Sequence, residues 1–376
     1  MAKRVLVFAE YGVRNGAENS WLSLARVLKT SDWEFIVATP DGTEFATAVS
    51  KDFQLAPLRF HDSDDQRKNQ EDIRLEMAQL IASVEPDIVH CNSLSTSRLC
   101  GPVTNELSVP AVGHLRDILK LSKKAVADIN CLDQIITVSN ATRDFHIDQG
   151  MNAEKAKTIY NGVDLNTFHP NPRSASLKVD LGLPDEARLI SCIGQIGMRK
   201  GTDISIRCFH ILQQKTGEAN LFLAIVGQRN SKKQEAIEYE QQCHELVQKL
   251  GLSKHVLFLG RRNDVASLLN ESILVLHSAR QEPLGRVLLE ASASGCPIVA
   301  TDVGGTREIL SGLDAMDDLI CPMDDPESMA MRAIRLLNDN DFYGQVGKSL
   351  RDQAVNKFDI VNSAAVTEQL YEELIG

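Results

Sequence analysis

The sequence has no long apolar run and no excess of basic residues, and these two absences exclude several classes of protein. The first apolar stretch, residues 5–9, follows a basic start but is too short for a signal peptide or a membrane span. We therefore expect a cytoplasmic protein with no export signal and no transmembrane segment. The formal net charge is −11, which argues against a broad basic surface for nucleic acid.

Paired cysteines are also absent. The eight cysteines stand singly, without a Cys-x-x-Cys pair or a zinc-like spacing, and several lie inside apolar runs. We interpret them as reduced core residues, as in a cytosolic protein.

Short apolar runs alternate with longer helical patterns along the whole chain. With 376 residues, 43% of them hydrophobic, the chain is long enough for about two domains. The alternation predicts βαβ units and parallel sheets. Strands are predicted at 5–9, 35–39, 88–91, 111–114, 134–138 and 157–160, and then at 189–193, 221–226, 256–259, 273–277, 298–301 and 319–321. Helices are predicted between them, notably at 17–29, 71–84 and 141–149.

A polar stretch with two prolines, residues 166–174, interrupts the alternation and is typical of an exposed linker. We place the domain boundary there, with domains at 1–168 and 169–358. The predicted fold class is α/β, with two Rossmann-like doubly wound domains facing each other across a cleft. Such sheets bind ligands at the carboxyl ends of their strands.

Residues 278–301 are the richest segment and predict strand, loop, helix and strand. Pro283 suits the first helical turn and Gly295 suits the C-terminal stop. A helix that begins there would turn free amides toward a diphosphate. Those amides belong to Leu284, Gly285, Arg286 and Val287.

Two acids flank this helix start. Glu282 lies just ahead of it, and Glu290 lies two turns inside, among apolar residues. An unpaired carboxylate would be costly there, so Glu290 needs a partner such as a pair of ribose hydroxyls. A helix-start carboxylate and an exposed helix glutamate explain the spacing alone equally well.

The pattern Glu-Pro-Leu-Gly-x-x-x-x-Glu-Ala, followed by Gly-x-Pro-Ile-Val-Ala-Thr and Val-Gly-Gly, resembles glycosyltransferase family 4. The resemblance implies the GT-B fold and transfer of a sugar from a nucleotide-sugar donor with retention of anomeric configuration. It also implies that no metal ion or other cofactor is needed. By resemblance, Glu282 contacts the donor sugar, the backbone of 284–287 contacts the diphosphate and the sugar, and Glu290 contacts the ribose.

Two glycine-containing loops resemble the phosphate loops of the family. Residues 11–18 resemble the loop that faces the donor phosphate, with Gly16 left for the closest approach because Asn15 replaces the other glycine. Residues 194–201 resemble the loop whose cations bind the diphosphate. Lys200 matches, but Gln195 replaces the usual arginine, and whether Arg199 compensates stays open. In isolation, each loop reads as an ordinary turn.

Three further positions carry the resemblance. His114 ends a strand and matches the histidine near the donor sugar, although a lone histidine is more often structural. Arg261, after the strand at 256–259, is the candidate contact for the nucleobase. Residues 359–376 resemble the helix that crosses back onto the first domain. The predicted catalytic residues are therefore Glu282, His114 and Lys200.

Other functions fit less well. A glycoside hydrolase needs carboxylates about 5 Å or about 6.5–9.5 Å apart, whereas eight helical steps rise about 12 Å. Asp62 and Asp64 have the spacing of a metal-binding pair, but the polar run around them favours a solvated loop. A dehydrogenase is disfavoured because no Gly-x-Gly-x-x-Gly follows the first strand of either domain. A nucleotide-sugar-binding protein with little or no turnover stays open because of Asn15 and Gln195.

The expected partners are a UDP-, GDP- or ADP-sugar and an acceptor that is a glycan, a lipid-linked sugar or a small molecule. The expected role is polysaccharide or glycoconjugate biosynthesis. Residues 115–126 combine apolar residues at helical spacing with basic neighbours, as in a helix with weak peripheral membrane contact. We favour an ordinary surface helix because the basic cluster is short.

Overall fold

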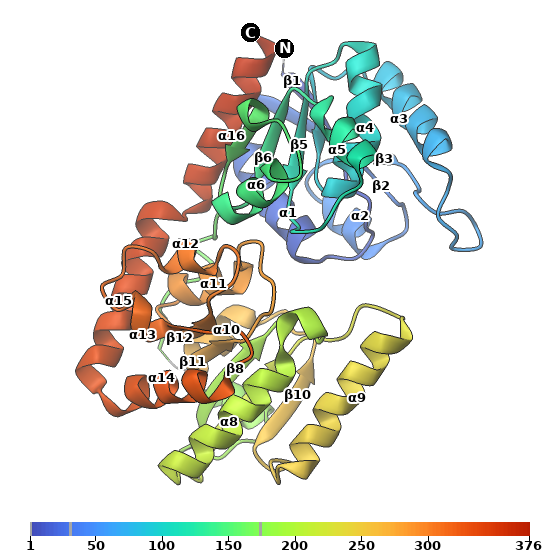
Figure 1. The fold of residues 1–376 in the computed structure, drawn as a ribbon. Helices are drawn as coiled ribbons and strands as arrows, with labels where there is room; N and C mark the ends of the chain where they lie inside the picture. Colours follow the sequence, from blue (N-terminus) through green and yellow to red (C-terminus); the bar gives the residue numbers. More distant parts are fainter. Residues whose placement is uncertain (1, 30–31, 173–174) are drawn as a thin grey trace. The chain divides into compact units, whose positions relative to one another are not determined.

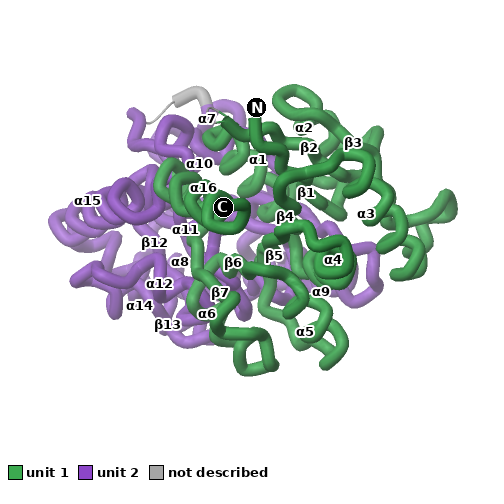
Figure 2. The backbone as a smooth tube through the Cα atoms, turned by 90° about the horizontal axis from the view of Figure 1, so that it is seen from above, with its two compact units in different colours: residues 1–162, 360–376 green, residues 163–359 purple. Residues whose placement is uncertain are grey.

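The computed structural model describes residues 2–29, 32–172 and 175–376. It divides into two compact units, unit 1 (Met1–Gly162 and Ile360–Gly376) and unit 2 (Val163–Asp359) (Figure 2). The predicted boundaries at 168 and 358 lie close to these crossings, but 163–168 and Asp359 belong to unit 2. The reason is local, since the Val163 amide donates to the Phe358 carbonyl at 2.8 Å and Val163 pairs with Asp359.

Unit 1 holds a parallel sheet whose seven described strands are ordered β3-β2-β1-β4-β5-β6-β7. The strands are β1 (Lys3–Phe8), β2 (Trp33–Thr39), β3 (Gln54–Pro57), β4 (Ile88–Cys91), β5 (Ala111–Leu115), β6 (Gln134–Thr137) and β7 (Ala156–Thr158). The helices are α1 (Gly16–Leu28), α2 (Glu44–Val49), α3 (Gln70–Val84), α4 (Leu94–Leu107), α5 (Lys123–Asn130), α6 (Asn140–Ile147) and α16 (Ile360–Ile375).

Helices cover both faces of this sheet (Figure 1). Val5 and Val7 of β1 face the cluster formed with α1, α2 and α16, whereas Leu6 and Phe8 face the cluster formed with α3 and α4. Burial on both faces explains why the strands read as continuous apolar runs.

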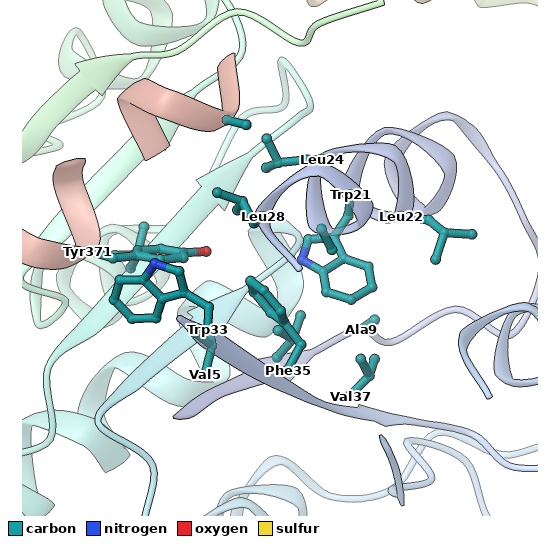
Figure 3. Packing of buried hydrophobic residues seen from close by; sticks show 14 of the residues in the cluster. Val5, Ala9, Trp21, Leu22, Leu24, Leu28, Trp33, Phe35, Val37 and Tyr371 are labelled. Carbon is teal, nitrogen blue, oxygen red and sulfur yellow. The ribbon is translucent and has the colours of Figure 1, made fainter. Parts of the chain in front are cut away.

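The C-terminal helix α16 is tied to the core of unit 1 by aromatic contacts. Trp33 of β2 and Tyr371 of α16 pack edge to face with ring centroids 5.3 Å apart (Figure 3). Trp33 also donates its indole N–H to Glu368 at 2.9 Å. The final helix therefore belongs to the first unit in space, although it lies at the far end of the chain.

Unit 2 repeats the plan with six described strands ordered β10-β9-β8-β11-β12-β13. They are β8 (Arg188–Ile193), β9 (Leu221–Val226), β10 (Val256–Gly260), β11 (Ser272–His277), β12 (Ile298–Thr301) and β13 (Ile320–Cys321). Around them lie α7 (Ala175–Asp180), α8 (Thr202–Thr216), α9 (Gln234–Lys249), α10 (Val265–Glu271), α11 (Arg286–Ala293), α12 (Thr306–Leu310), α13 (Met316–Leu319), α14 (Pro326–Asn338) and α15 (Asn340–Lys357). Two doubly wound units confirm the predicted α/β class.

The strand order of unit 2 reverses between β8 and β11, which are adjacent and parallel. Ligands of doubly wound sheets bind at such a reversal, outside the carboxyl ends of the two strands. The loops that follow β8 and β11 are residues 194–201 and 278–285, the two segments that the sequence analysis singled out.

The helix predicted over 115–126 is wrong for residues 115–122. Leu115 is the last residue of β5, and α5 starts only at Lys123, where the Ser122 hydroxyl caps it. Arg116 turns inward to donate to Asn92. Within the described ranges, no helix is long and apolar enough to cross a bilayer.

Candidate functional site

Hydrogen bonds join the loops after β8 and β11. The Arg280 amide donates to the Arg199 carbonyl at 2.8 Å, and the Ser278 hydroxyl donates to the Gly201 carbonyl at 2.6 Å. Gly201 is in the left-handed conformation, with φ +63°, and lies directly against Ser278. A residue with a side chain would not fit at Gly201, so the glycine allows the two loops to approach each other.

Three side chains meet between these loops. The Lys200 ammonium forms an ion pair with Oε2 of Glu282, and the same oxygen accepts a hydrogen bond from His277 Nε2 at 2.9 Å. The Glu282 and His277 side chains are nearly fully buried, and Lys200 is mostly buried. The structure thus brings together two of the predicted catalytic residues, Lys200 and Glu282, and places His277 beside Glu282.

The ionisation of this cluster follows from its contacts. Burial disfavours the charged carboxylate of Glu282, but the Lys200 charge and the His277 hydrogen bond outweigh it and hold the Glu282 pKa well below its usual range. Burial lowers the pKa of His277, although the Glu282 carboxylate opposes the shift. The site therefore holds an ionised carboxylate next to a cation and a neutral imidazole.

The sequence analysis missed His277. Its signal was its position as the last residue of the predicted strand 273–277, directly before the Glu282 loop. The carboxyl end of a strand at a reversal point is where ligand-binding side chains gather in such folds. The main chain of Glu282 is also fixed, because the Gly305 amide donates to its carbonyl at 3.0 Å.

Helix α11 begins later than predicted. Its first residue is Arg286, and Gly285 is the N-cap with φ +105°, so Pro283 lies in the loop and not in the first turn. The positive φ of Gly285 turns the backbone between Pro283 and the first residue of α11. The amides of Arg286 and Val287 remain in the first turn, where a helix offers no internal acceptor, whereas those of Leu284 and Gly285 belong to the preceding loop.

Glu290 is buried on α11 and has a protein partner. Its Oε1 accepts from Arg286 Nε at 2.8 Å, one turn away. Burial raises the Glu290 pKa even though the Arg286 charge opposes this. The sequence analysis named no protein partner for Glu290, and the structure pairs it with Arg286. A contact between Glu290 and a ribose stays a prediction.

The other predicted donor-binding residues are Gly16, Arg199 and Arg261. The Arg199 and Arg261 side chains are exposed. Gly16 is the first residue of α1, and a Cβ added there would meet no described atom within 4 Å. Asn15, which replaces a family glycine, serves as the N-cap of α1 and forms a capping box with Glu18.

His114 lies in unit 1, at the carboxyl end of β5. Arg116 donates to its Nδ1 at 3.1 Å, so the ring proton is on Nε2, which has no hydrogen-bond partner among the described residues. Burial and the Arg116 charge lower the His114 pKa well below its usual range. His114 is therefore a neutral imidazole with one N–H to donate.

Asp62 and Asp64 lie in a loop, and the Asp62 carboxylate is hydrogen-bonded to backbone amides of that loop. Oδ1 of Asp62 accepts from the amides of Asp64 and Gln66, both at 2.9 Å. Both acids are exposed. Across the described ranges, no cluster of three or more His, Cys, Asp or Glu residues has the arrangement of a metal site.

Two protein-family models match nearly the whole chain. Residues 14–167 match the model described as Glycosyltransferase Family 4, and residues 174–353 match the one described as Glycosyl transferases group 1. The chain belongs to glycosyltransferase family 4. The matched ranges contain the Lys200–Glu282–His277 cluster, His114 and the start of α11.

Curated relatives agree with this assignment. The lipopolysaccharide core biosynthesis mannosyltransferase LpsB of Rhizobium meliloti is 28% identical over 58% of this chain and 60% of its own length. The UDP-Gal:alpha-D-GlcNAc-diphosphoundecaprenol alpha-1,3-galactosyltransferase of Escherichia coli is 23% identical over 80% of this chain and 79% of its own.

A solved structure shares the fold of this family 4 chain. Anabaena HepE, crystallised in complex with UDP and glucose, superposes with a TM-score of 0.86 at 21% identity and covers 99% of this chain and 100% of its own. At this identity the likeness establishes the fold, which confirms the GT-B architecture expected from the sequence.

Proposed function

We propose that this protein transfers a sugar from a nucleotide-sugar donor to a hydroxylated acceptor with retention of anomeric configuration. The observation that carries the proposal is the buried Lys200–Glu282–His277 cluster at the strand reversal of unit 2. The first turn of α11 follows it in the chain by a few residues. The two elements supply a positive environment for a diphosphate and a negative charge for a sugar.

The chemistry needs both signs of charge. When the bond from the anomeric carbon to the diphosphate breaks, the diphosphate gains negative charge and the sugar gains positive charge. Lys200 and the amides of Arg286 and Val287 would stabilise the leaving diphosphate. The ionised Glu282 would stabilise the sugar, and the acceptor hydroxyl would pass its proton to the oxygen of the departing diphosphate as the new bond forms.

We further propose that no metal ion is required, because these fixed donors and the exposed Arg199 provide the positive charge. Treatment with EDTA should leave activity unchanged. Activity that is lost and then restored by Mg²⁺ or Mn²⁺ would show that a metal carries the charge.

The names of the relatives support a choice of donor and acceptor classes. HepE binds UDP and glucose, and the Escherichia coli relative is named for a UDP-sugar donor and a lipid-linked acceptor. We propose a nucleotide-sugar donor, with UDP-sugars to be tested first, and a glycan or lipid-linked acceptor in a cytoplasmic step of polysaccharide or glycoconjugate biosynthesis.

The test is a panel of UDP-, GDP- and ADP-sugars with two readouts, thermal stabilisation and release of the nucleoside diphosphate. At least one donor should stabilise the wild-type protein and be turned over. The Glu282→Gln variant should bind that donor with similar affinity but lose most turnover, and near-normal kcat would contradict the assignment. Stabilisation without turnover in the wild type would favour a binding protein, the alternative suggested by Gln195 in place of an arginine.

A further inference from the structure

Arg280 is a half-buried residue of the loop after β11, and its guanidinium makes several hydrogen bonds there. Its Nη1 donates to the Met198 carbonyl at 2.9 Å and to Oδ1 of Asp203 at 3.0 Å, and its Nη2 donates to Oδ2 of Asp203 at 2.9 Å. Its Nε donates to Asp324 at 2.6 Å. Bidentate arginine–carboxylate pairs of this kind fix both position and orientation.

Asp203 is itself fixed. It lies in the first turn of α8, and the Tyr239 hydroxyl of α9 donates to its Oδ1. Burial opposes ionisation of Asp203, but the hydrogen bonds from Arg280 and Tyr239 outweigh it and lower the Asp203 pKa. Arg280 therefore forms an ion pair with the ionised carboxylate of Asp203, which α8 and α9 hold in a fixed position.

The main chain of Arg280 contacts the same turn as its side chain. The Arg280 amide donates to the Arg199 carbonyl at 2.8 Å, while the guanidinium binds the Met198 carbonyl. These two carbonyls belong to the short 3₁₀ turn Met198–Lys200. The turn is thus held at successive peptide groups directly before Lys200.

We propose that Arg280 and Asp203 are positioning residues that fix the Met198–Lys200 turn and thereby hold the Lys200 ammonium against Glu282. Neither is one of the residues to which the family resemblance gave a role. Only the consequence for turnover rests on the proposed function. A lysine side chain is long and loses much rotational freedom when it is held in one place, so a fixed turn beneath it favours the paired geometry.

Lysine cannot replace Arg280 in this role. A single ammonium cannot bind both carboxylate oxygens of Asp203 and also reach the Met198 carbonyl and Asp324 in the planar arrangement of a guanidinium. The Arg280→Lys variant keeps the positive charge but loses the bidentate contact with Asp203 and the hydrogen bond to Met198. This variant therefore separates the positioning role of Arg280 from the general electrostatic effect of a cation near the site.

The state of Glu282 reports the position of Lys200. The charged or titratable groups that act on Glu282 are Lys200 and His277. If the turn loosens and Lys200 moves away, burial of the Glu282 carboxyl is no longer outweighed and its pKa rises. This readout does not depend on any catalytic activity.

The experiment is a ¹³C NMR titration of protein labelled at the glutamate carboxyl carbon, with the Glu282 signal assigned by its loss in Glu282→Gln. Wild type should keep Glu282 ionised at pH 4.5, the ordinary pKa of a glutamate. Arg280→Ala, Arg280→Lys and Asp203→Asn should each raise the Glu282 pKa. The control is Arg335→Ala, which removes an exposed arginine paired with Asp318 elsewhere in unit 2.

The proposal would be overturned if the Glu282 pKa in both Arg280→Ala and Arg280→Lys equals that of the wild type. If Arg280→Ala does not fold, the titrations of Arg280→Lys and Asp203→Asn decide the question. In the donor panel, the same variants should lose roughly 10²-fold in kcat/KM, the loss typical of a 1 Å misplacement. A wild-type protein with no turnover of UDP-glucose, GDP-mannose or ADP-glucose would refute the proposed function, while the titration would still test the positioning role.

Discussion

Gly201→Ala tests how closely the two loops of the site must approach. Gly201 ends the Met198–Lys200 turn and is the N-cap of α8, with φ +63° and ψ +35°. A Cβ at this position would lie 2.0 Å from the Ser278 carbonyl oxygen and 3.0 Å from its carbon. Because the contact is with backbone, no side-chain rotation can relieve it.

The expected loss has two parts. The left-handed conformation costs alanine about 1–2 kcal/mol relative to glycine, without regard to neighbours. The loop after β11 must also retreat by about 1 Å, since real Cβ contacts shorter than 3.0 Å are essentially never found. A displacement of that size at a catalytic centre typically reduces turnover about 10²-fold.

Gly217→Ala is a matched control on the same helix. Gly217 follows the C-terminal end of α8 with φ +68°, and a Cβ there would meet no described atom within 4 Å. Chemical unfolding followed by circular dichroism should show the left-handed cost in both variants. Only Gly201→Ala should lose turnover, and equal turnover in the two variants would refute the close-approach argument.

The remaining predictions concern charges in the site. Lys200→Ala should reduce kcat at least 10-fold more than Arg199→Ala, because Lys200 contacts Glu282 whereas the Arg199 side chain is exposed. Steady-state kinetics with the active donor measures the ratio of the two losses, and equal losses would contradict this prediction. Glu290→Ala should weaken binding of the free nucleotide, with kcat changed less, because a ribose contact would act equally in substrate and transition state. Calorimetry checks this, and an unchanged Kd would exclude the ribose role.

Apolar runs predicted twelve of the thirteen described strands, most of which are buried on both faces and therefore need continuous apolar residues. The exception is β3, Gln54–Pro57. This edge strand is partly exposed and contains a glutamine and a proline, so its sequence has no apolar run. Tertiary pairing with β2, and not local preference, makes this segment a strand.

In the site, the resemblance to family 4 identified Glu282 and Lys200 but not His277, which contacts Glu282. The three residues come from two loops and a strand end, and only the parallel pairing of β8 with β11 places them side by side. The start of α11 was misplaced for a local reason. Pro283 is a common first residue of a helix, but the positive φ of Gly285 delays the helix to Arg286.

Acid should lower the free energy of unfolding of unit 1, because the unit contains buried histidines with lowered pKa values. Burial and the Arg116 charge lower the pKa of His90 to about 3, and the His114 pKa is also well below its usual range. Between these values and about 6.5, the unfolded chain binds more protons than the folded one. Stability is therefore present above the unfolded pKa and falls as the pH drops below it.

The size of the effect follows from the same pKa difference. At pH 5 the contribution of His90 lowers the free energy of unfolding by about 2 kcal/mol relative to pH 7.5, since one pH unit corresponds to about 1.4 kcal/mol. The lowered pKa of His146 adds to this loss, whereas the raised pKa of Glu18 acts in the opposite direction. Tyr371 holds His90 by a 2.6 Å hydrogen bond inside the core, which keeps the ring away from water.

Urea unfolding at pH 7.5 and pH 5 measures this loss in unit 1 alone, because the two tryptophans of the chain, Trp21 and Trp33, both lie there and report its unfolding by fluorescence. His90→Gln removes one titrating group, so the difference in stability between the two pH values should shrink by about 2 kcal/mol, whatever the variant does to stability at pH 7.5. His244→Gln, a change at an exposed histidine of α9, should leave the difference unchanged. A His90→Gln protein with the full wild-type pH dependence would show that His90 is already protonated in the folded state, and the neutral core pair of histidines would have to be abandoned.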